Sequence, residues 1–143
     1  MRYTAGLAAA ITAARAGSKV VLLEQNSFLG GALAIGLSGY KIDIHSGKDD
    51  GLYFEAVEKP FGIPYGALVS RDVDNLMFAG RCCSCDAVAL GSLRVIPSCL
   101  GMGQAAGVGA SLCARQNILP AQVDVQAVRS ILLEQNAILS MEG

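Results

Sequence analysis

Apolar segments of two kinds alternate along the first part of the chain. Residues 4–16 combine an alanine-rich, helix-favouring composition with a closing glycine, Gly17, and this pattern predicts a helix. Residues 19–24 (KVVLLE) form a solid apolar run that ends at an acid, which is typical of a buried strand in a parallel sheet. Residues 74–80 (DNLMFAG) predict a second buried strand that ends in glycine.

The last part of the chain predicts two helices. Ser98 begins a long segment rich in small residues, and Asn117 and Pro120 end it. Asp124 is placed to cap a final helix that runs to about Gln135, with apolar residues at helical spacing.

Together these segments favour an α/β fold in which helices cover a mainly parallel sheet. Residues 40–44 and 52–57 predict two shorter strands, and residues 60–64 predict an extended connector interrupted by proline and glycine.

The length of 143 residues fits one domain and excludes a complete two-domain flavoenzyme or dehydrogenase. Hydrophobic residues make up 52% and charged residues 16%, so the chain has enough apolar side chains to form a core.

The charge and hydropathy of the chain limit the classes of partner and the locations that the sequence favours. The net charge is -1 and no basic stripe is present, so nothing favours nucleic acid as a partner. Residues 95–114 are long and mostly apolar, but their glycines, Pro97 and Gln104 favour a buried helix over a membrane span. Arg15 interrupts the N-terminal apolar run, which argues against a secretion signal. Five cysteines without a framework spacing predict a reducing, cytoplasmic location.

The first candidate motif surrounds Gly6. A dinucleotide-binding unit has a G-x-G-x-x-G turn before a helix, then a strand, then an acid that binds a ribose hydroxyl. Gly6 occupies the third glycine position, and Glu24 follows the apolar run near the expected distance. Met1 and Tyr3 stand at the first two glycine positions. An ordinary helix and strand with a terminal acid is the alternative interpretation.

The second candidate motif spans residues 80–107. Arg81 follows the predicted strand directly, at the edge of a sheet where ligands bind in α/β folds. Gly101-x-Gly103-x-x-Ala106 formally fits a glycine turn at which a helix N-terminus approaches a cofactor. Close helix packing through small residues explains the same glycines equally well.

Cys82 and Cys85 have C-x-x-C spacing, which is compatible with redox chemistry or a metal. The sequence supplies too few further ligands for a metal site, so we predict none and favour inert cysteines. His45 is the only histidine, and the spacings contain no nucleophile–histidine–acid arrangement.

The two glycine motifs together resemble a family. The segments AGLAAAITAARAGSKVVLLEQNSFLGG and FGIPYGALVSRDVDNLMFAGRCCSCDAVALGSLRVIPSCLGMGQAAGVGASLCARQ resemble the N-terminal and C-terminal FAD-binding parts of bacterial FAD-dependent oxidoreductases. That family has a glutathione-reductase-like, Rossmann-like FAD domain and is distantly related to the fumarate reductase flavoproteins. In the family roughly two further domain lengths of chain separate these parts. The resemblance therefore implies a single truncated FAD-binding domain with an N-terminal piece (1–36) and a C-terminal piece (39–143), lacking the first strand and the substrate domain.

The resemblance also implies cofactor contacts for ten residues. Gly6 would begin the pyrophosphate helix, Glu24 would bind the adenosine ribose, and the other eight would line the path to the flavin or approach its ring. These eight residues are Gly30, Gly31, Arg81, Cys82, Arg94, Met102, Gly103 and Gln104. The catalytic residues stay unknown.

Three functions follow as hypotheses. The first is an FAD-binding oxidoreductase that transfers hydride or electrons to or from an unknown small-molecule substrate. The second is a non-catalytic remnant that does not retain FAD. The third is a small dithiol redox or metal module built on Cys82 and Cys85. Without the first strand the predicted sheet has unpaired edges, so we also expect a homo-oligomer formed through them.

Overall fold

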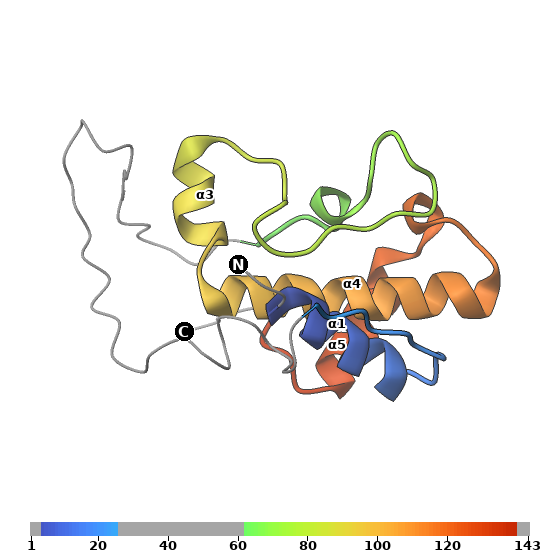
Figure 1. The fold of residues 1–143 in the computed structure, drawn as a ribbon. Coiled ribbons are helices and arrows are strands. Elements are labelled where there is room, and N and C mark those ends of the chain that lie inside the picture. Colours follow the sequence, from blue (N-terminus) through green and yellow to red (C-terminus); the bar gives the residue numbers. More distant parts are fainter. Residues whose placement is uncertain (1–3, 26–61, 140–143) are drawn as a thin grey trace.

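The computed structural model describes residues 4–25 and 62–139, and helices dominate this part of the chain (Figure 1). A long helix, α4, lies at the centre, and each of the other helical elements contacts it. The elements in chain order are α1 (Thr4–Arg15), the 3-10 turn η1 (Tyr65–Leu68), α3 (Ala87–Leu93), α4 (Ile96–Gln116), the 3-10 turn η2 (Pro120–Gln122) and α5 (Val125–Glu134). The strands predicted at 40–44 and 52–57, together with Gly30, Gly31 and His45, lie outside the described residues.

Local capping chemistry explains where the helices end. Gly17 adopts φ 88° directly after α1, and the Ser18 amide then donates to the Ala13 carbonyl at 3.0 Å. Asn117 ends α4 in the left-handed conformation, with φ 53°. The Asp124 carboxylate accepts a hydrogen bond of 2.9 Å from the Gln126 amide and so begins α5. The three helices predicted from these residues are confirmed.

Helix α3 was not predicted from the sequence. Asp86 precedes it with extended backbone, and its carboxylate accepts a 2.7 Å hydrogen bond from the Ala89 amide. This is an ordinary N-cap, because a short acidic side chain satisfies a free amide of the first turn. The seven-residue helix positions Arg94, the residue at its C-terminal end.

The predicted Rossmann-like α/β fold with a mainly parallel sheet is wrong for the described residues, which contain no strand ladder. The only β pairing among them is one isolated antiparallel bridge between Val69 and Met77. Residues 19–24 are extended, but no described segment pairs with them, and Val21 and Leu23 are each 85% exposed. An apolar run becomes a strand only when a neighbouring segment accepts and donates its backbone hydrogen bonds.

The closest packing joins α1 to α4. Ala5, Ala9 and Ala13 recur at every fourth residue and line one face of α1. A Cβ added at Gly103 would lie 3.0 Å from the Ala5 Cα, and one added at Gly107 would lie 3.0 Å from the Ala9 Cα. Contact positions advance together along both helices, so α1 and α4 run in the same direction. Consequently their N-termini lie at the same end of the molecule.

Polar side chains hold the other end of this helix pair. The Ser111 hydroxyl of α4 donates to the Ala16 carbonyl at 3.3 Å and accepts from the Ser18 hydroxyl at 2.8 Å. Ser111 is only 1% exposed, so these bonds satisfy a hydroxyl that water cannot reach. They anchor the chain just after α1, from which the extended segment 19–24 begins.

Two apolar clusters flank α4. The first packs one side of α4 against α1, η1 and the 77–83 loop, and the second packs the far half of α4 against α5. Tyr65 contacts both clusters. Among the described residues, no helix has the length and hydropathy that a bilayer span requires.

Candidate functional site

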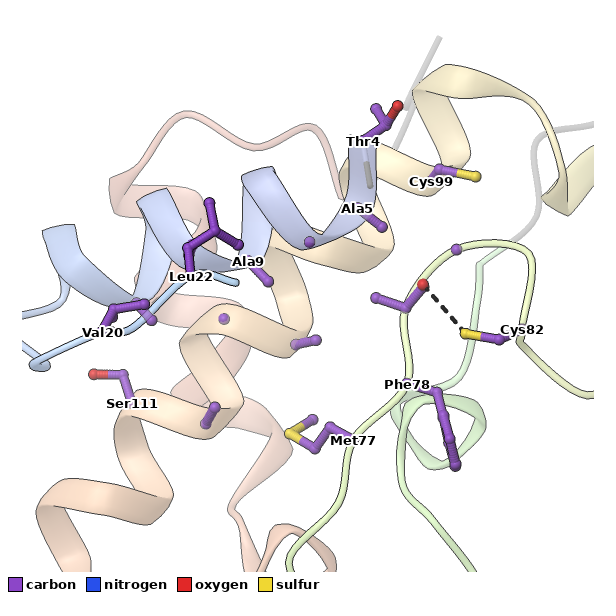
Figure 2. Close-up of a pocket in the computed structure, with 18 of the residues that line it drawn as sticks. Thr4, Ala5, Ala9, Val20, Leu22, Met77, Phe78, Cys82, Cys99 and Ser111 are labelled. Atoms are coloured by element: carbon purple, nitrogen blue, oxygen red, sulfur yellow. Dashed lines mark hydrogen bonds between the residues drawn. The ribbon is translucent and has the colours of Figure 1, made fainter. Parts of the chain in front are cut away.

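A pocket of about 790 Å³ lies beside the α1–α4 pair. Figure 2 shows the extended segment, with Val20 and Leu22, on one side of it, and the loop that carries Met77, Phe78 and Cys82 on the other. The small residues of α1 and α4 form the surface between these two walls, as follows: Ala5, Gly6, Ala9, Ala10, Ala13, Ala106, Gly107, Ala110 and Ala114. Small side chains leave room for a ligand here, and the volume lies within the range of roughly 300–1,000 Å³ that is usual for ligand pockets.

Both helices point their N-termini to one end of this pocket. Thr4 of α1 and Ile96 of α4 line it there, and neither helix has an acidic residue in its first turn. Because a helix N-terminus carries free amides and a partial positive charge, two parallel N-termini favour an anion.

The charged side chains that line the pocket are all basic. They are Lys19, Arg81 and Arg94, and no aspartate or glutamate of the described residues lines it. Opposite charges would normally be interspersed on a protein surface, so a pocket that carries one sign has an electrostatic preference for an anionic ligand.

A hydrogen bond orients the Arg81 side chain. Arg81 Nε donates to the Arg94 carbonyl at 2.8 Å, which ties the 77–82 loop to the end of α3. Burial raises the pKa of the Cys99 thiol, and the hydrogen-bonded Arg81 guanidinium partly offsets that rise. The Cys99 thiol donates to the carbonyl oxygens of Leu93 and Arg94, each at 3.7 Å. Cys99 therefore links α4 to the end of α3.

A tight turn aims Arg81 and Cys82 at the pocket. Gly80 adopts φ 90°, and the Cys83 amide donates to the Gly80 carbonyl at 3.1 Å. A Cβ at Gly80 would lie 3.1 Å from the Ala5 Cβ, so the turn also approaches α1 closely. The Cys82 thiol donates to the Ala79 carbonyl at 3.4 Å (Figure 2). Glycine at position 80 meets both requirements, since it lacks a Cβ and accepts a positive φ.

The structure brings four of the ten sequence-predicted site residues together in this pocket. They are Gly6, Arg81, Cys82 and Arg94. Glu24 lies just beyond the wall formed by residues 18–22 and does not line the pocket. Gly30 and Gly31 lie outside the described residues.

The three residues of α4 that were predicted to approach the flavin do not line the pocket. Met102 is 2% exposed and lies in the first apolar cluster. Gly103 contacts the Ala5 backbone, so close helix packing, the alternative interpretation of the glycine pattern, is confirmed for it. The Gln104 amide donates to the Gln135 side chain at 3.4 Å, toward α5.

Sequence reasoning missed the alanine and serine residues of the pocket. Ala9, Ala13 and Ser111 shape it, yet none carries a chemistry that a motif search selects. The available signal was the spacing. Small residues recur at every fourth position in both 5–13 and 103–111, which indicates two helices that pack backbone to backbone.

The cysteines fall into two environments, and all five are free thiols. Cys82 and Cys85 are exposed, whereas Cys83, Cys99 and Cys113 are buried. Burial raises the pKa of the Cys83 thiol, and the neighbouring Cys85 and Cys82 raise it further. Within the described residues no three histidine, cysteine or acidic side chains form a group suited to a metal ion.

Comparison with known proteins identifies the family. The model of the family described as FAD dependent oxidoreductase matches residues 3–38 and 34–132. Together these segments cover most of the chain, and the chain belongs to this family. No curated protein and no solved structure matches it.

Proposed function

We propose that this chain binds FAD in the pocket beside α1 and α4, with the cofactor's phosphate groups at the electropositive end. Family membership supports FAD as the cofactor. The observation that carries the proposal is the convergence of two helix N-termini, Arg81 and Arg94 at one end of a cavity that no described carboxylate lines. A pyrophosphate has the charge that this end favours.

The chain's own residues would hold and shield the cofactor. Gly6 lies in the first turn of α1, where a missing side chain permits close approach of a phosphate to the backbone. Arg94 presents a guanidinium, which binds phosphate with directional hydrogen bonds. Apolar side chains, among them Met77 and Phe78, form the wall that would exclude water from a ring system. FAD, when bound, supplies hydride or electron transfer.

The remaining residues that the sequence predicts to contact the cofactor are assigned individually. Glu24 is the proposed ribose ligand, and its support is its position at the end of the segment that forms one pocket wall. We assign no cofactor contact to Met102, Gly103 or Gln104, because the helix contacts described above occupy them. The catalytic residue and the substrate have no candidate in the described residues.

The test is retention of FAD by the purified chain. The protein is incubated with FAD, desalted and examined by visible absorption and by flavin fluorescence. We expect a stoichiometric flavin spectrum that survives desalting and is lost at high salt, because the phosphate contacts are electrostatic. AMP and ADP are then compared as competitors. Stronger competition by ADP supports a site for the diphosphate.

Arg94→Met sharpens the test because it removes the charge and leaves the carbonyl that accepts from Arg81. We expect FAD binding to weaken about tenfold or more, since a charged hydrogen bond contributes about 1.5–3 kcal/mol. The matched control is Arg129→Met in α5, an exposed arginine that does not line the pocket. Equal losses in both variants would contradict a phosphate contact at Arg94.

A second candidate is a remnant that does not retain FAD. The observation that favours it is the absence of a strand ladder in the described residues, so residues 19–24 have no β pairing there. The same experiment separates the two candidates. A colourless protein after desalting, with no binding of ADP, supports the remnant.

A further inference from the structure

The proposed binding of FAD assigns no chemical step to the thiols of the two exposed cysteines, although Cys82 lines the same pocket. Cys82 and Cys85 both reach solvent, and only Cys83 and Ser84 separate them. The Cys82 thiol donates to the Ala79 carbonyl at 3.4 Å, and the Cys85 thiol donates to the Cys83 carbonyl at 3.7 Å, so both thiols lie on the short segment around Gly80. Two accessible cysteines at C-x-x-C spacing are typical of a dithiol that forms and breaks a disulfide.

The two exposed cysteines differ in their relation to the pocket. Cys82 lines it, whereas Cys85 does not. Arg81 precedes Cys82 directly, and Arg94 and Lys19 supply the other positive charges of the lining. A molecule that reaches Cys82 through the pocket thus passes the electropositive surface that is also proposed for the FAD phosphates, so FAD and this molecule compete for it. This asymmetry assigns different tasks to the two thiols.

We propose that Cys82 and Cys85 form a thiol–disulfide exchange site whose reactant is a small disulfide carrying carboxylate groups. Cys82 is the thiol that attacks, because it lies at the pocket that favours the anion. Cys85 is the resolving thiol, because it lies three residues after Cys82, is exposed and lies outside the pocket.

The exchange balances in two steps. The Cys82 thiolate attacks one sulfur of the disulfide RS–SR, the S–S bond breaks, and RS⁻ leaves and takes up a proton. The Cys85 thiolate then attacks the Cys82 sulfur of the mixed disulfide and releases the second RS⁻, which is protonated in turn. The two protein thiols are oxidised to one intramolecular disulfide, and the small disulfide is reduced to two thiols. No metal and no flavin takes part.

The buried cysteines are excluded from this chemistry. Cys83, Cys99 and Cys113 are 7%, 6% and 7% exposed. Burial raises the pKa of each thiol, which disfavours the reactive thiolate. Oxidation is therefore expected at two of the five cysteines.

The protein without added FAD is tested with two disulfides of opposite net charge, glutathione disulfide and cystamine; cystamine is much the smaller, so faster reaction of glutathione disulfide would not come from easier access. Thiol counting and intact-mass analysis follow the reaction. We expect glutathione disulfide to oxidise two thiols per chain and to react about tenfold faster than cystamine at low salt, with the difference shrinking as salt screens the arginines. Equal rates for the two probes would contradict the proposal that the site prefers an anionic disulfide.

Two matched variants test the roles of the thiols. Cys85→Ser is expected to trap the mixed disulfide with glutathione at Cys82, which peptide mapping detects. Cys82→Ser is expected to lose both the fast reaction and the preference for the anionic probe. Both positions are exposed, so helical content measured by circular dichroism should not change. Fast, charge-selective reaction of Cys82→Ser, or no trapped adduct in Cys85→Ser, would overturn the proposal.

Discussion

Gly103 of α4 lies directly against the backbone carbonyl group of Ala5 in α1. No side chain stands between the two helices at this point, and the same relationship recurs one turn later between Gly107 and Ala9. This contact fixes the separation of α1 from α4 and brings their N-termini to the same end. The electropositive end of the pocket therefore depends on the close helix packing at these two glycines.

Gly103→Ala is expected to destabilise the protein strongly. The added methyl group would overlap the Ala5 carbonyl group, and relief requires α1 to move away from α4. We expect a loss of about 1–3 kcal/mol in the free energy of unfolding, the usual cost of overpacking. Urea unfolding followed by circular dichroism measures it.

Gly101→Ala in the same helix is the control. Nothing lies within 4 Å of a Cβ at that position, and Gly101 is exposed. Alanine should therefore stabilise α4 by about 0.5–1 kcal/mol, because glycine is the poorer helix former. If both substitutions change stability alike, the backbone contact at Gly103 does not limit packing.

Tyr65→Phe is expected to stabilise the protein slightly. The Tyr65 hydroxyl is buried and has no hydrogen-bond partner among the described residues. Removing it leaves the ring in place and removes an unmet desolvation cost, for an expected gain of about 1 kcal/mol. Thermal unfolding at neutral pH measures the change, and a marked loss of stability would show that the hydroxyl has a partner.

The pH dependence of stability, compared between the original protein and Tyr65→Phe, tests the same hydroxyl in a second way. Burial first, and then Cys113, raises the pKa of Tyr65 from 10.0 to about 12. The folded protein thus keeps the phenol proton at a pH where the unfolded chain releases it. Proton release from Tyr65 in the unfolded chain therefore does not reduce stability below pH 10.0, and it reduces the free energy of unfolding as the pH rises from 10.0 toward about 12. The phenylalanine variant should lose less stability across that window.

Helix ends were predictable from the sequence because capping is local. Gly17, Asn117 and Asp124 each act within four residues of their position, and each ends or begins a helix as expected. Asp86 carries the same signal, but the short helix that follows it lacks a long apolar periodicity. The pattern of α3 was therefore too brief to identify.

The sheet was not predictable from the sequence, and the role of the glycines in α4 was ambiguous, for two physical reasons. The run 19–24 is apolar enough for a strand, but strand formation depends on a distant partner, and no described residue supplies one. The glycines of α4 are ambiguous because a phosphate and a second helix both require a missing Cβ. At Gly103 the backbone of α1 occupies the space beside the glycine, whereas the basic residues Arg81 and Arg94 line the pocket.

Val21→Lys is expected to reduce self-association. Val21 is 85% exposed in an extended apolar segment, an arrangement that favours pairing with another chain. Static light scattering against concentration should show less association in the variant than in the original protein. Because the side chain is exposed, stability should change by less than about 0.5 kcal/mol. Ile138→Lys, at an apolar residue that is 83% exposed, is the control and should leave association unchanged.

Gly80→Ala and Gly17→Ala together test how the turn before Arg81 is held. Both glycines have positive φ, 90° and 88°, so alanine strains the backbone similarly at each, by about 1–2 kcal/mol. Only at Gly80 does the new Cβ also crowd a neighbour, the Ala5 Cβ at 3.1 Å, whereas nothing lies within 4 Å at Gly17. We therefore expect a larger loss of unfolding free energy for Gly80→Ala.

The same two variants separate stability from binding. A shift of the turn at Gly80 moves Arg81 and Cys82, which line the pocket, whereas Gly17 does not line it. Gly80→Ala should weaken FAD or ADP binding, measured by fluorescence titration at a temperature where both variants remain folded. Gly17→Ala should bind as the original protein does. Equal binding by both variants would mean that ligand affinity does not depend on how Gly80 sets the turn.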